Sequence, residues 1–244
     1  VQKDPVAVKA RIGVVPDESN LYPELTCHRN LDYLGQPYRL GRSERRQRID
    51  ELLARFHLAD RADKPFKSLS KGLKRRLTVA AALIHSPEVV FLDEPTTGLD
   101  VPSARDLRKL VKEINQAGAT VFLTTHNLAE AEELAGRVAI LLQGRLVTLG
   151  RTEEIRRRVG QTRFISVTFS RSVPAETIRA ACQAVRSVAA EGDRFRLEAV
   201  ETGPAVAQLA DLARRENIDI VDLTTAPPSL EETFVSIINQ EAGS

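Results

Sequence analysis

The pattern of apolar and polar positions predicts a parallel strand–helix–strand unit in the middle of the chain. Residues 89–92 form a continuous apolar run that ends in two acids, as in a strand buried on both faces of a parallel sheet. Apolar side chains then recur at helical spacing between residues 107 and 114, and residues 120–125 read as the next strand. A right-handed crossover between parallel strands brings both carboxyl ends to one edge of the sheet, so the side chains that follow the two strands should lie together there.

Different patterns flank this unit. Residues 9–15 read as a short strand, and a helical insertion with several Pro and Gly breaks follows at about residues 18–85. After the unit, residues 137–149 predict a hairpin around Gln143-Gly144. We expect these elements to form one α/β domain over residues 1–150.

Past residue 160 the chain alternates between short strand patterns and helical patterns. The strand patterns lie at residues 164–169, 194–200 and 218–223, and the helical patterns at residues 174–185 and 205–216. Ser229 stands three residues before Glu232, a spacing that fits a capping box at the start of a last helix. We therefore expect residues 151–244 to form a separate small α+β domain, with the boundary near residues 150–160.

Composition limits the class of protein without naming a function. The chain has 244 residues, of which 42% are hydrophobic and 28% charged, and a formal net charge of +2, which is typical of a globular protein. Its longest apolar runs fall far short of the roughly 18 residues that span a bilayer, so any membrane role must come through a partner. Cys27 and Cys182 are too few and too far apart for a disulfide framework or a zinc site, which favours a reducing compartment.

Four short motifs follow one another in a fixed order: Leu69-Ser70-Lys71-Gly72-Leu73, Phe91-Leu92-Asp93-Glu94-Pro95, Gly98-Leu99-Asp100 and Thr124-Thr125-His126. Together they resemble the signature, Walker B, D-loop and switch-histidine motifs of the ATPase subunit of ABC transporters. The resemblance covers about residues 9–150 and implies an α/β ABC ATPase core of the P-loop type with a helical insertion. Residues 160–239, with Pro228-Ser229-Leu230-Glu231-Glu232-Thr233-Phe234 near their end, are similar in layout to the C-terminal extension of ATPases that serve drug, antibiotic or sodium exporters.

The resemblance implies a role in ATP hydrolysis for three side chains at the expected sheet edge. Asp93 is the Walker B position, where a carboxylate holds the Mg²⁺ that bridges nucleotide phosphates. Glu94 matches the catalytic carboxylate that orients or deprotonates the attacking water, and His126 matches the switch histidine that contacts the γ-phosphate. Taken alone, Asp93-Glu94 reads equally well as solvated acids at the end of a strand, and a lone histidine is more often a polar surface residue.

Further residues are expected to bind the nucleotide. Ser70, Lys71 and Gly72 match the signature, in which a hydroxyl, backbone N–H groups and the start of a helix bind the γ-phosphate held by the opposite subunit. Lys71 replaces the first glycine of the commonest form and keeps a positive charge near phosphate. Asp100 matches the D-loop aspartate and also fits an ordinary helix cap. Asp17 stands where the family usually has a glutamine that binds magnesium and water, so its role stays open.

One motif of the family has no counterpart in this sequence. No G-x-x-x-x-G-K-[ST] phosphate loop occurs in the 244 residues, which start at Val1 and contain no methionine. We expect a core that lacks its Walker A part, truncated before the family's glutamine loop, and a chain that cannot turn over ATP unaided.

These features predict an ATP-binding subunit of an ABC exporter that uses ATP and Mg²⁺. It would pair head to tail with a second ATPase subunit and drive a separate membrane permease, in the cytoplasm on the inner face of the cell membrane. Two alternatives stay open: a regulatory module without turnover, and a soluble ABC ATPase that acts on ribosomes or DNA. Basic residues between Arg39 and Arg76 motivate the second alternative, although we expect no nucleic-acid partner.

Overall fold

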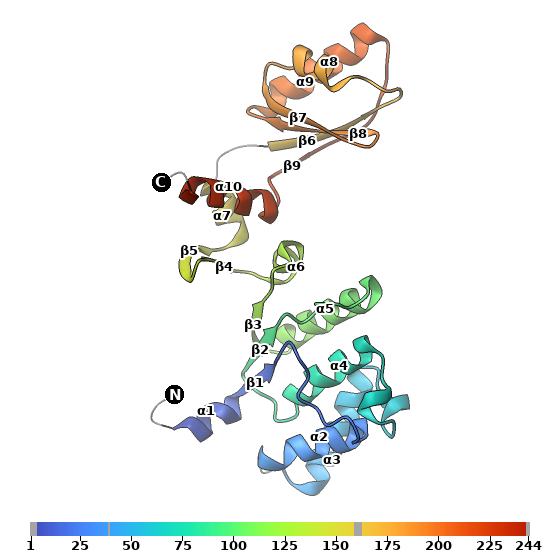
Figure 1. Cartoon of the computed structure of the whole chain (residues 1–244), viewed down its shortest axis with the longest axis vertical. Helices are drawn as coiled ribbons and strands as arrows, with labels where there is room; N and C mark the ends of the chain where they lie inside the picture. The colour runs from blue at the N-terminus through green and yellow to red at the C-terminus, as the bar shows by residue number, and fades with distance from the viewer. Residues whose placement is uncertain (1–3, 39, 159–162, 243–244) are drawn as a thin grey trace. The chain divides into compact units, whose positions relative to one another are not determined.

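The computed structural model describes residues 4–38, 40–158 and 163–242, and the chain forms two compact units divided between Leu134 and Ala135 (Figure 1). Each unit has its own hydrophobic core. Arg39 and residues 159–160 of the expected boundary region lie outside the described residues. The domain boundary expected near residue 150 stays a prediction.

The first unit is built on a three-stranded parallel sheet. Its strands are β1 (Ile12–Val15), β2 (Val89–Asp93) and β3 (Thr120–Thr124), with β2 in the middle. Helix α5 (Val101–Gln116) connects β2 to β3, and its buried residues are the apolar ones that recur at helical spacing. The parallel crossover expected from the sequence is therefore confirmed.

The chain before β1 is helical, so the prediction of a strand over residues 9–15 is wrong for its first three residues. Helix α1 (Pro5–Arg11) begins after Asp4, whose Oδ1 accepts a hydrogen bond of 2.9 Å from the Ala7 backbone N–H. Pro5 suits the first turn of a helix, and the Ala, Lys and Arg residues that follow are good helix formers. The cap and these preferences outweigh the apolar pattern that suggested a strand.

The stretch between β1 and β2 is largely helical. It contains α2 (Cys27–Gly35), α3 (Arg42–Arg55) and α4 (Lys71–Ala82), with 3₁₀ turns η1, η2 and η3 at Gln36–Tyr38, Ala59–Arg61 and Phe66–Ser68. Thr26 caps α2, because its Oγ1 accepts a hydrogen bond of 3.2 Å from the backbone N–H of Arg29.

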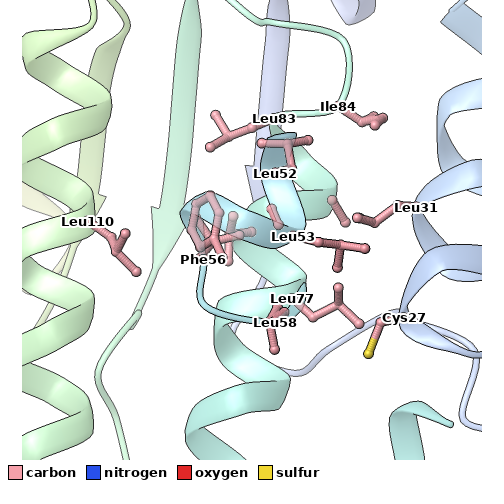
Figure 2. Close-up of a cluster of buried hydrophobic side chains, with 14 of the residues drawn as sticks. Cys27, Leu31, Leu52, Leu53, Phe56, Leu58, Leu77, Leu83, Ile84 and Leu110 are labelled. Atoms are coloured by element: carbon pink, nitrogen blue, oxygen red, sulfur yellow. The ribbon is translucent and has the colours of Figure 1, made fainter. Parts of the chain in front are cut away.

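Apolar side chains of these helices fill the core of the first unit. Leu31 of α2, Leu53 of α3 and Leu77 of α4 are buried, as is Phe56 just after α3. Figure 2 shows them clustered with Cys27 and other apolar side chains. Cys27 and Cys182 are both free and buried.

The two faces of the parallel sheet have opposite environments. Val90 and Leu92 of β2 point into the core and are buried. The other face carries Val14, Phe91 and Phe122, which pair in register across the three strands and are 55%, 37% and 55% exposed. Parallel sheets are normally covered on both faces, so this exposed apolar row is unusual.

The second unit begins with the predicted hairpin. Strands β4 (Val138–Leu142) and β5 (Arg145–Gly150) pair antiparallel around Gln143 and Gly144, which both have positive φ as a tight hairpin turn requires. Helix α7 (Thr152–Arg158) follows.

The rest of the second unit follows the order β-α-β-β-α-β. Its elements are β6 (Arg163–Phe169), α8 (Ala175–Ala181), β7 (Val185–Glu191), β8 (Arg194–Ala199), α9 (Thr202–Glu216) and β9 (Ile220–Ala226). The sheet is antiparallel with strand order β7-β8-β6-β9, which is the ferredoxin-like arrangement. This confirms a small α+β fold for this part of the chain.

The helix predicted over residues 174–185 is too long. Cys182 has an extended backbone, with φ −114° and ψ 90°, and ends α8. Val185 already belongs to β7, an edge strand that the sequence does not signal. Its Arg, Ser, Ala and Glu residues have low β-propensity and are mostly exposed, so neither composition nor alternation marks it.

Helix α10 (Leu230–Ala242) begins with the predicted capping box. The Glu232 N–H donates to Ser229 Oγ at 3.2 Å, and the Ser229 N–H donates to Glu232 Oε2 at 2.6 Å, so both halves of the box are present. Within the part of the chain that the structure describes, none of the helices has the length and apolar character needed to cross a membrane.

Candidate functional site

The carboxyl edge of the parallel sheet collects the polar side chains that follow β2 and β3. Asp93 pairs in register with Thr124, the last residue of β3. The Thr124 hydroxyl donates a hydrogen bond of 2.5 Å to Asp93 Oδ1. This contact fixes the orientation of the Asp93 carboxylate at the end of its strand.

Glu94 is held in a restricted position by its neighbours. Its φ of 45° lies in the left-handed region, which non-glycine residues seldom adopt and which is enriched at functional sites. Its Oε1 accepts a 3.0 Å bond from the His126 backbone N–H and lies 2.8 Å from His126 Nδ1. Its Oε2 accepts a 2.7 Å bond from the hydroxyl of Thr97. The carboxylate is therefore oriented at both oxygens.

Glu94 and His126 shift each other's pKa in opposite directions. Burial raises the pKa of Glu94, but the hydrogen bonds from His126 and Thr97 outweigh it and hold the pKa below its ordinary value of 4.5. The hydrogen bond to Glu94, together with the negative charge there, raises the pKa of His126 above 6.5. The pair favours a carboxylate beside a protonated imidazole, a combination that can orient water and contact a phosphate.

The residues that resemble the ABC signature, Ser70, Lys71 and Gly72, lie at the start of α4. Ser70 is the N-cap, because its Oγ accepts a hydrogen bond of 3.4 Å from the Leu73 N–H. A hydroxyl that accepts a bond keeps its own proton for another acceptor, and the first turn of a helix attracts anions. The Lys71 side chain lies against Gly98, because a Cβ added to Gly98 would fall 2.0 Å from Lys71 Nζ.

The starts of α4 and α5 lie close together. A Cβ added to Gly72 would fall 2.6 Å from the hydroxyl oxygen of Ser103, in the first turn of α5. Asp100 caps α5 by accepting a 2.7 Å bond from the Ser103 N–H, and this bond lowers the pKa of Asp100. The signature and the D-loop-like motif thus form one contiguous surface.

Asp17 follows β1, and its side chain is exposed. Its carbonyl oxygen accepts a hydrogen bond of 3.0 Å from Nη1 of Arg75, a residue of α4. The same guanidinium donates to the carbonyl of Asp93 at 2.5 Å. Arg75 thereby connects Asp17 with the edge that carries Asp93.

The donor set at this edge suits a magnesium ion that arrives with a nucleotide. Mg²⁺ is usually bound by one or two carboxylates and by phosphate oxygens, and water completes its coordination. Asp93 presents such a carboxylate. Among the described residues there is no cluster of three or more His, Cys, Asp and Glu side chains that could hold a metal by themselves. The residues therefore fit a shared metal better than one bound by protein alone.

Sequence reasoning identified the residues at this edge but missed some of their partners. Thr97 and Arg75 were not expected to act there. The sequence gives no signal for the role of Thr97, because its hydrogen bond to Glu94 depends on the turn after β2. Arg75 falls within the basic stretch between Arg39 and Arg76, but it lies three residues after Gly72 and four before Val79. It therefore shares the buried face of α4, and helical periodicity could have identified it.

Two family models match the sequence. Residues 2–97 match the model described as ABC transporter, and residues 150–238 match the model described as ATP-binding protein DrrA1-3-like, C-terminal domain. The second match starts where the separate α+β domain is expected.

Similar proteins include ATP-binding proteins named for drug resistance. The linearmycin resistance ATP-binding protein LnrL of Bacillus subtilis (strain 168) is 33% identical over 245 residues, which cover 97% of this chain and 77% of LnrL. The daunorubicin resistance ATP-binding protein DrrA3 of Streptomyces coeruleorubidus is 34% identical over 243 residues, which cover 99% of this chain and 76% of DrrA3.

Solved structures give the same result for the fold. A solved structure of the ATP binding subunit of an ABC transporter superposes with a TM-score of 0.58 and 30% identity, and the match covers 64% of this chain and 65% of that one. The expected α/β ABC ATPase fold class is thus confirmed. The chain belongs to the family of ABC transporter ATP-binding proteins and has a DrrA-like C-terminal domain.

Proposed function

We propose that this chain is the ATP-binding and ATP-hydrolysing part of an ABC exporter, and that it energises a separate membrane permease. The observation that supports this most directly is the pair of contacts at the ends of β2 and β3, Asp93 with Thr124 and Glu94 with His126. Both pairs place groups suited to phosphate chemistry at one sheet edge.

Each residue of the edge has a proposed task. A magnesium ion bound with ATP would neutralise charge on the phosphates. Asp93 contributes a carboxylate ligand for that ion. Glu94 orients the attacking water and accepts its proton, and His126 both fixes Glu94 and donates to a terminal phosphate oxygen. Asp17 offers a further carboxylate near the same phosphates.

The second half of each site is proposed to come from another ATPase subunit in a head-to-tail dimer. Ser70, Lys71 and Gly72 form a helix start with a hydroxyl, backbone N–H groups and an ammonium group, all of which suit a terminal phosphate. Asp100 lies on the same surface and would face the partner. The dimer is thus proposed to hold two ATP molecules between the sheet edge of one subunit and the signature of the other.

These 244 residues are proposed not to turn over ATP by themselves. They contain no phosphate-loop sequence to bind the β- and γ-phosphates. Steady hydrolysis of ATP by the isolated 244-residue chain would contradict this part of the proposal.

Export is proposed because relatives of the chain are named for drug resistance and for Nod factor export. The permease would contact residues 18–65 of the helical insertion, which display the exposed Tyr22 and Tyr33 with ring centroids 5.0 Å apart. Exposed aromatic pairs are common where proteins bind partners. The subunit would then lie on the inner face of the cell membrane.

The alternative of a soluble ATPase acting on nucleic acid has less support. Several basic residues of the stretch that motivated it are paired with acids: Arg45 with Asp32, Lys67 with Glu24, and Arg76 with Asp106. Pairing lowers the positive charge available to a phosphate backbone. The alternative of a regulatory module would be supported if the assembled transporter hydrolysed ATP equally well without Glu94.

Mixed dimers test the proposed pairing. They are made from the natural subunit, meaning the subunit as its gene encodes it, assembled with its permease. One mixed dimer carries Glu94→Gln in one copy and Ser70→Ala in the other, and the second carries both changes in one copy beside an unaltered one. Head-to-tail pairing places both changes of the first dimer in a single ATP site and leaves the other site intact. The second dimer has one change in each site. We expect faster ATP hydrolysis in the first, and equal rates would contradict the pairing.

A further inference from the structure

Arg75 is a nearly buried arginine of α4 and is only 8% exposed. Each of the four hydrogen bonds that it makes within the described residues goes to a main-chain carbonyl oxygen. It donates to Pro16 and, at 3.0 Å, to Asp17, both after β1. It also donates to Asp93 at 2.5 Å, at the end of β2, and to Pro95 at 2.9 Å. One side chain therefore holds two segments that are far apart in the sequence.

The guanidinium group is suited to this position. It is planar, carries five N–H donors in a fixed geometry and stays charged, so it can bond several carbonyl oxygens that lie in different directions. Burial lowers the pKa of Arg75, and the charges of Asp17, Asp93, Glu130 and Glu94 oppose this effect. The cation is thus placed among the acids of the candidate site and fixed by neutral oxygens.

Glu130 is the buried acid of this group. It lies in α6 (Leu128–Leu134), is fully buried, and its two carboxylate oxygens have no hydrogen-bond partner within the described residues. Its charge acts on both Arg75 and His126. Arg75 is itself nearly buried, and the negative charge of Glu130 counteracts the effect of that burial on the pKa of Arg75.

Arg75 also lies on the helix that Ser70 caps, five residues after the cap. Any movement of Arg75 relative to the strand ends therefore moves the start of α4 as well. In the proposed dimer, Ser70 faces the nucleotide of the partner, whereas Asp93 and Glu94 face the nucleotide of their own subunit. Arg75 lies between these two sets of groups.

We propose that Arg75 is a positioning residue that ties the signature helix to the ends of β1 and β2 and so couples the two ATP sites of the dimer. The inference rests on the proposed function. It adds a specific physical link: four hydrogen bonds through which the state of one site changes the geometry presented to the other.

Arg75→Lys and Arg76→Lys form a matched pair of variants for a test. Lysine keeps the charge, but a single ammonium group cannot reproduce the planar set of bonds that Arg75 makes. Arg76 lies on the same helix, and its guanidinium pairs with Asp106 Oδ2 at 2.8 Å on α5. Both variants are made in the natural subunit assembled with its permease, and ATP hydrolysis is measured against ATP concentration.

We expect the unaltered transporter to show a Hill coefficient above about 1, and Arg75→Lys to bring it to about 1 with a loss of kcat on the order of tenfold. Arg76→Lys should leave the Hill coefficient and kcat as they are in the unaltered transporter. A residue that only stabilises the fold would lower the melting temperature and leave the Hill coefficient unchanged. A Hill coefficient of about 1 in the unaltered protein, or no change in Arg75→Lys, would overturn the inference.

Hydrogen exchange separates this inference from the proposed function. In Arg75→Lys, amides after β1 and after β2 should exchange faster than in Arg76→Lys. If the unaltered transporter hydrolyses no ATP, the proposed function fails. Equal amide exchange rates in Arg75→Lys and Arg76→Lys would overturn the role of Arg75, whatever the ATPase result. If Arg75→Lys does not fold, the double variant Arg75→Gln with Glu130→Gln takes its place, because it removes both buried charges together. It must show the same changes in Hill coefficient, kcat and amide exchange.

Discussion

Glu94 and His126 shift each other's pKa in opposite directions, and this makes the pair sensitive to pH. The pKa of His126 is raised above 6.5, so its part of the interaction is present below about pH 6.5 and is lost as the pH rises through the raised value. The pKa of Glu94 is lowered below 4.5, so its part is present above about pH 4.5 and is lost as the pH falls through the lowered value. The pair is therefore strongest between these limits.

We predict that Glu94→Gln lowers the pKa of His126, because the variant removes the negative charge that stabilises the imidazolium. An NMR titration of the histidine side chains measures this. His85, whose pKa is lowered by burial and whose Nε2 contacts the Ile12 carbonyl at 2.9 Å, is an internal control that should not change. An unchanged pKa of His126 would show that the pair does not form in solution.

At the level of residues, the sequence predicted the polar groups of the edge but not how they are held. Asp93, Glu94 and His126 follow strand patterns, so their meeting follows from the parallel crossover. The bond from Thr97 depends on a tight turn with Glu94 at positive φ, which no motif specifies. Arg75 depends on how α4 packs on the strand ends, and such tertiary contacts are not visible in local patterns.

At the level of elements, the starts of α4 and α5 pack closely because Gly72 has no side chain. We predict that Gly72→Ala destabilises the protein by about 1–3 kcal/mol, since its Cβ would overlap Ser103. Gly136→Ala is the control, because an added Cβ there meets nothing within 4 Å. Thermal unfolding followed by circular dichroism compares the two variants, and equal melting temperatures would contradict the close packing.

The capping box of α10 gives a second prediction at this scale. Ser229→Ala removes the hydroxyl that accepts the Glu232 N–H and should cost about 1 kcal/mol of stability. Glu231→Gln changes an exposed residue of the same first turn and should cost less. Urea unfolding monitored in the second unit measures both, and a larger loss for Glu231→Gln would contradict the assigned cap.

Elements with strong local signals were predicted correctly, and those without were not. Strand β2 is marked by a continuous apolar run, helix α5 by apolar residues at helical spacing, and the hairpin mainly by the turn residues Gln143-Gly144. Strand β7 has neither, because it is an edge strand with mostly exposed residues. The strand expected over residues 9–15 overlaps the last three residues of helix α1, because the apolar pattern does not reveal the cap at Asp4 that starts this helix.

At the level of the whole molecule, the two units carry different information. The first unit contains every residue proposed to act on ATP, and the second contains the ferredoxin-like fold that matches the DrrA-like C-terminal domain. The proposed ATP hydrolysis therefore depends on the edge of one small parallel sheet.

The central claim is that Glu94 activates water for ATP hydrolysis, and a pair of glutamate variants tests it most directly. Glu88 and Glu94 flank the same strand at opposite ends, and Glu88 is paired with Arg11 at 3.6 Å, at the edge that carries no candidate residue. ATP turnover by the natural subunit assembled with its permease should fall by about 10²–10⁴-fold in Glu94→Gln and stay unchanged in Glu88→Gln. Full turnover in Glu94→Gln would contradict the claim.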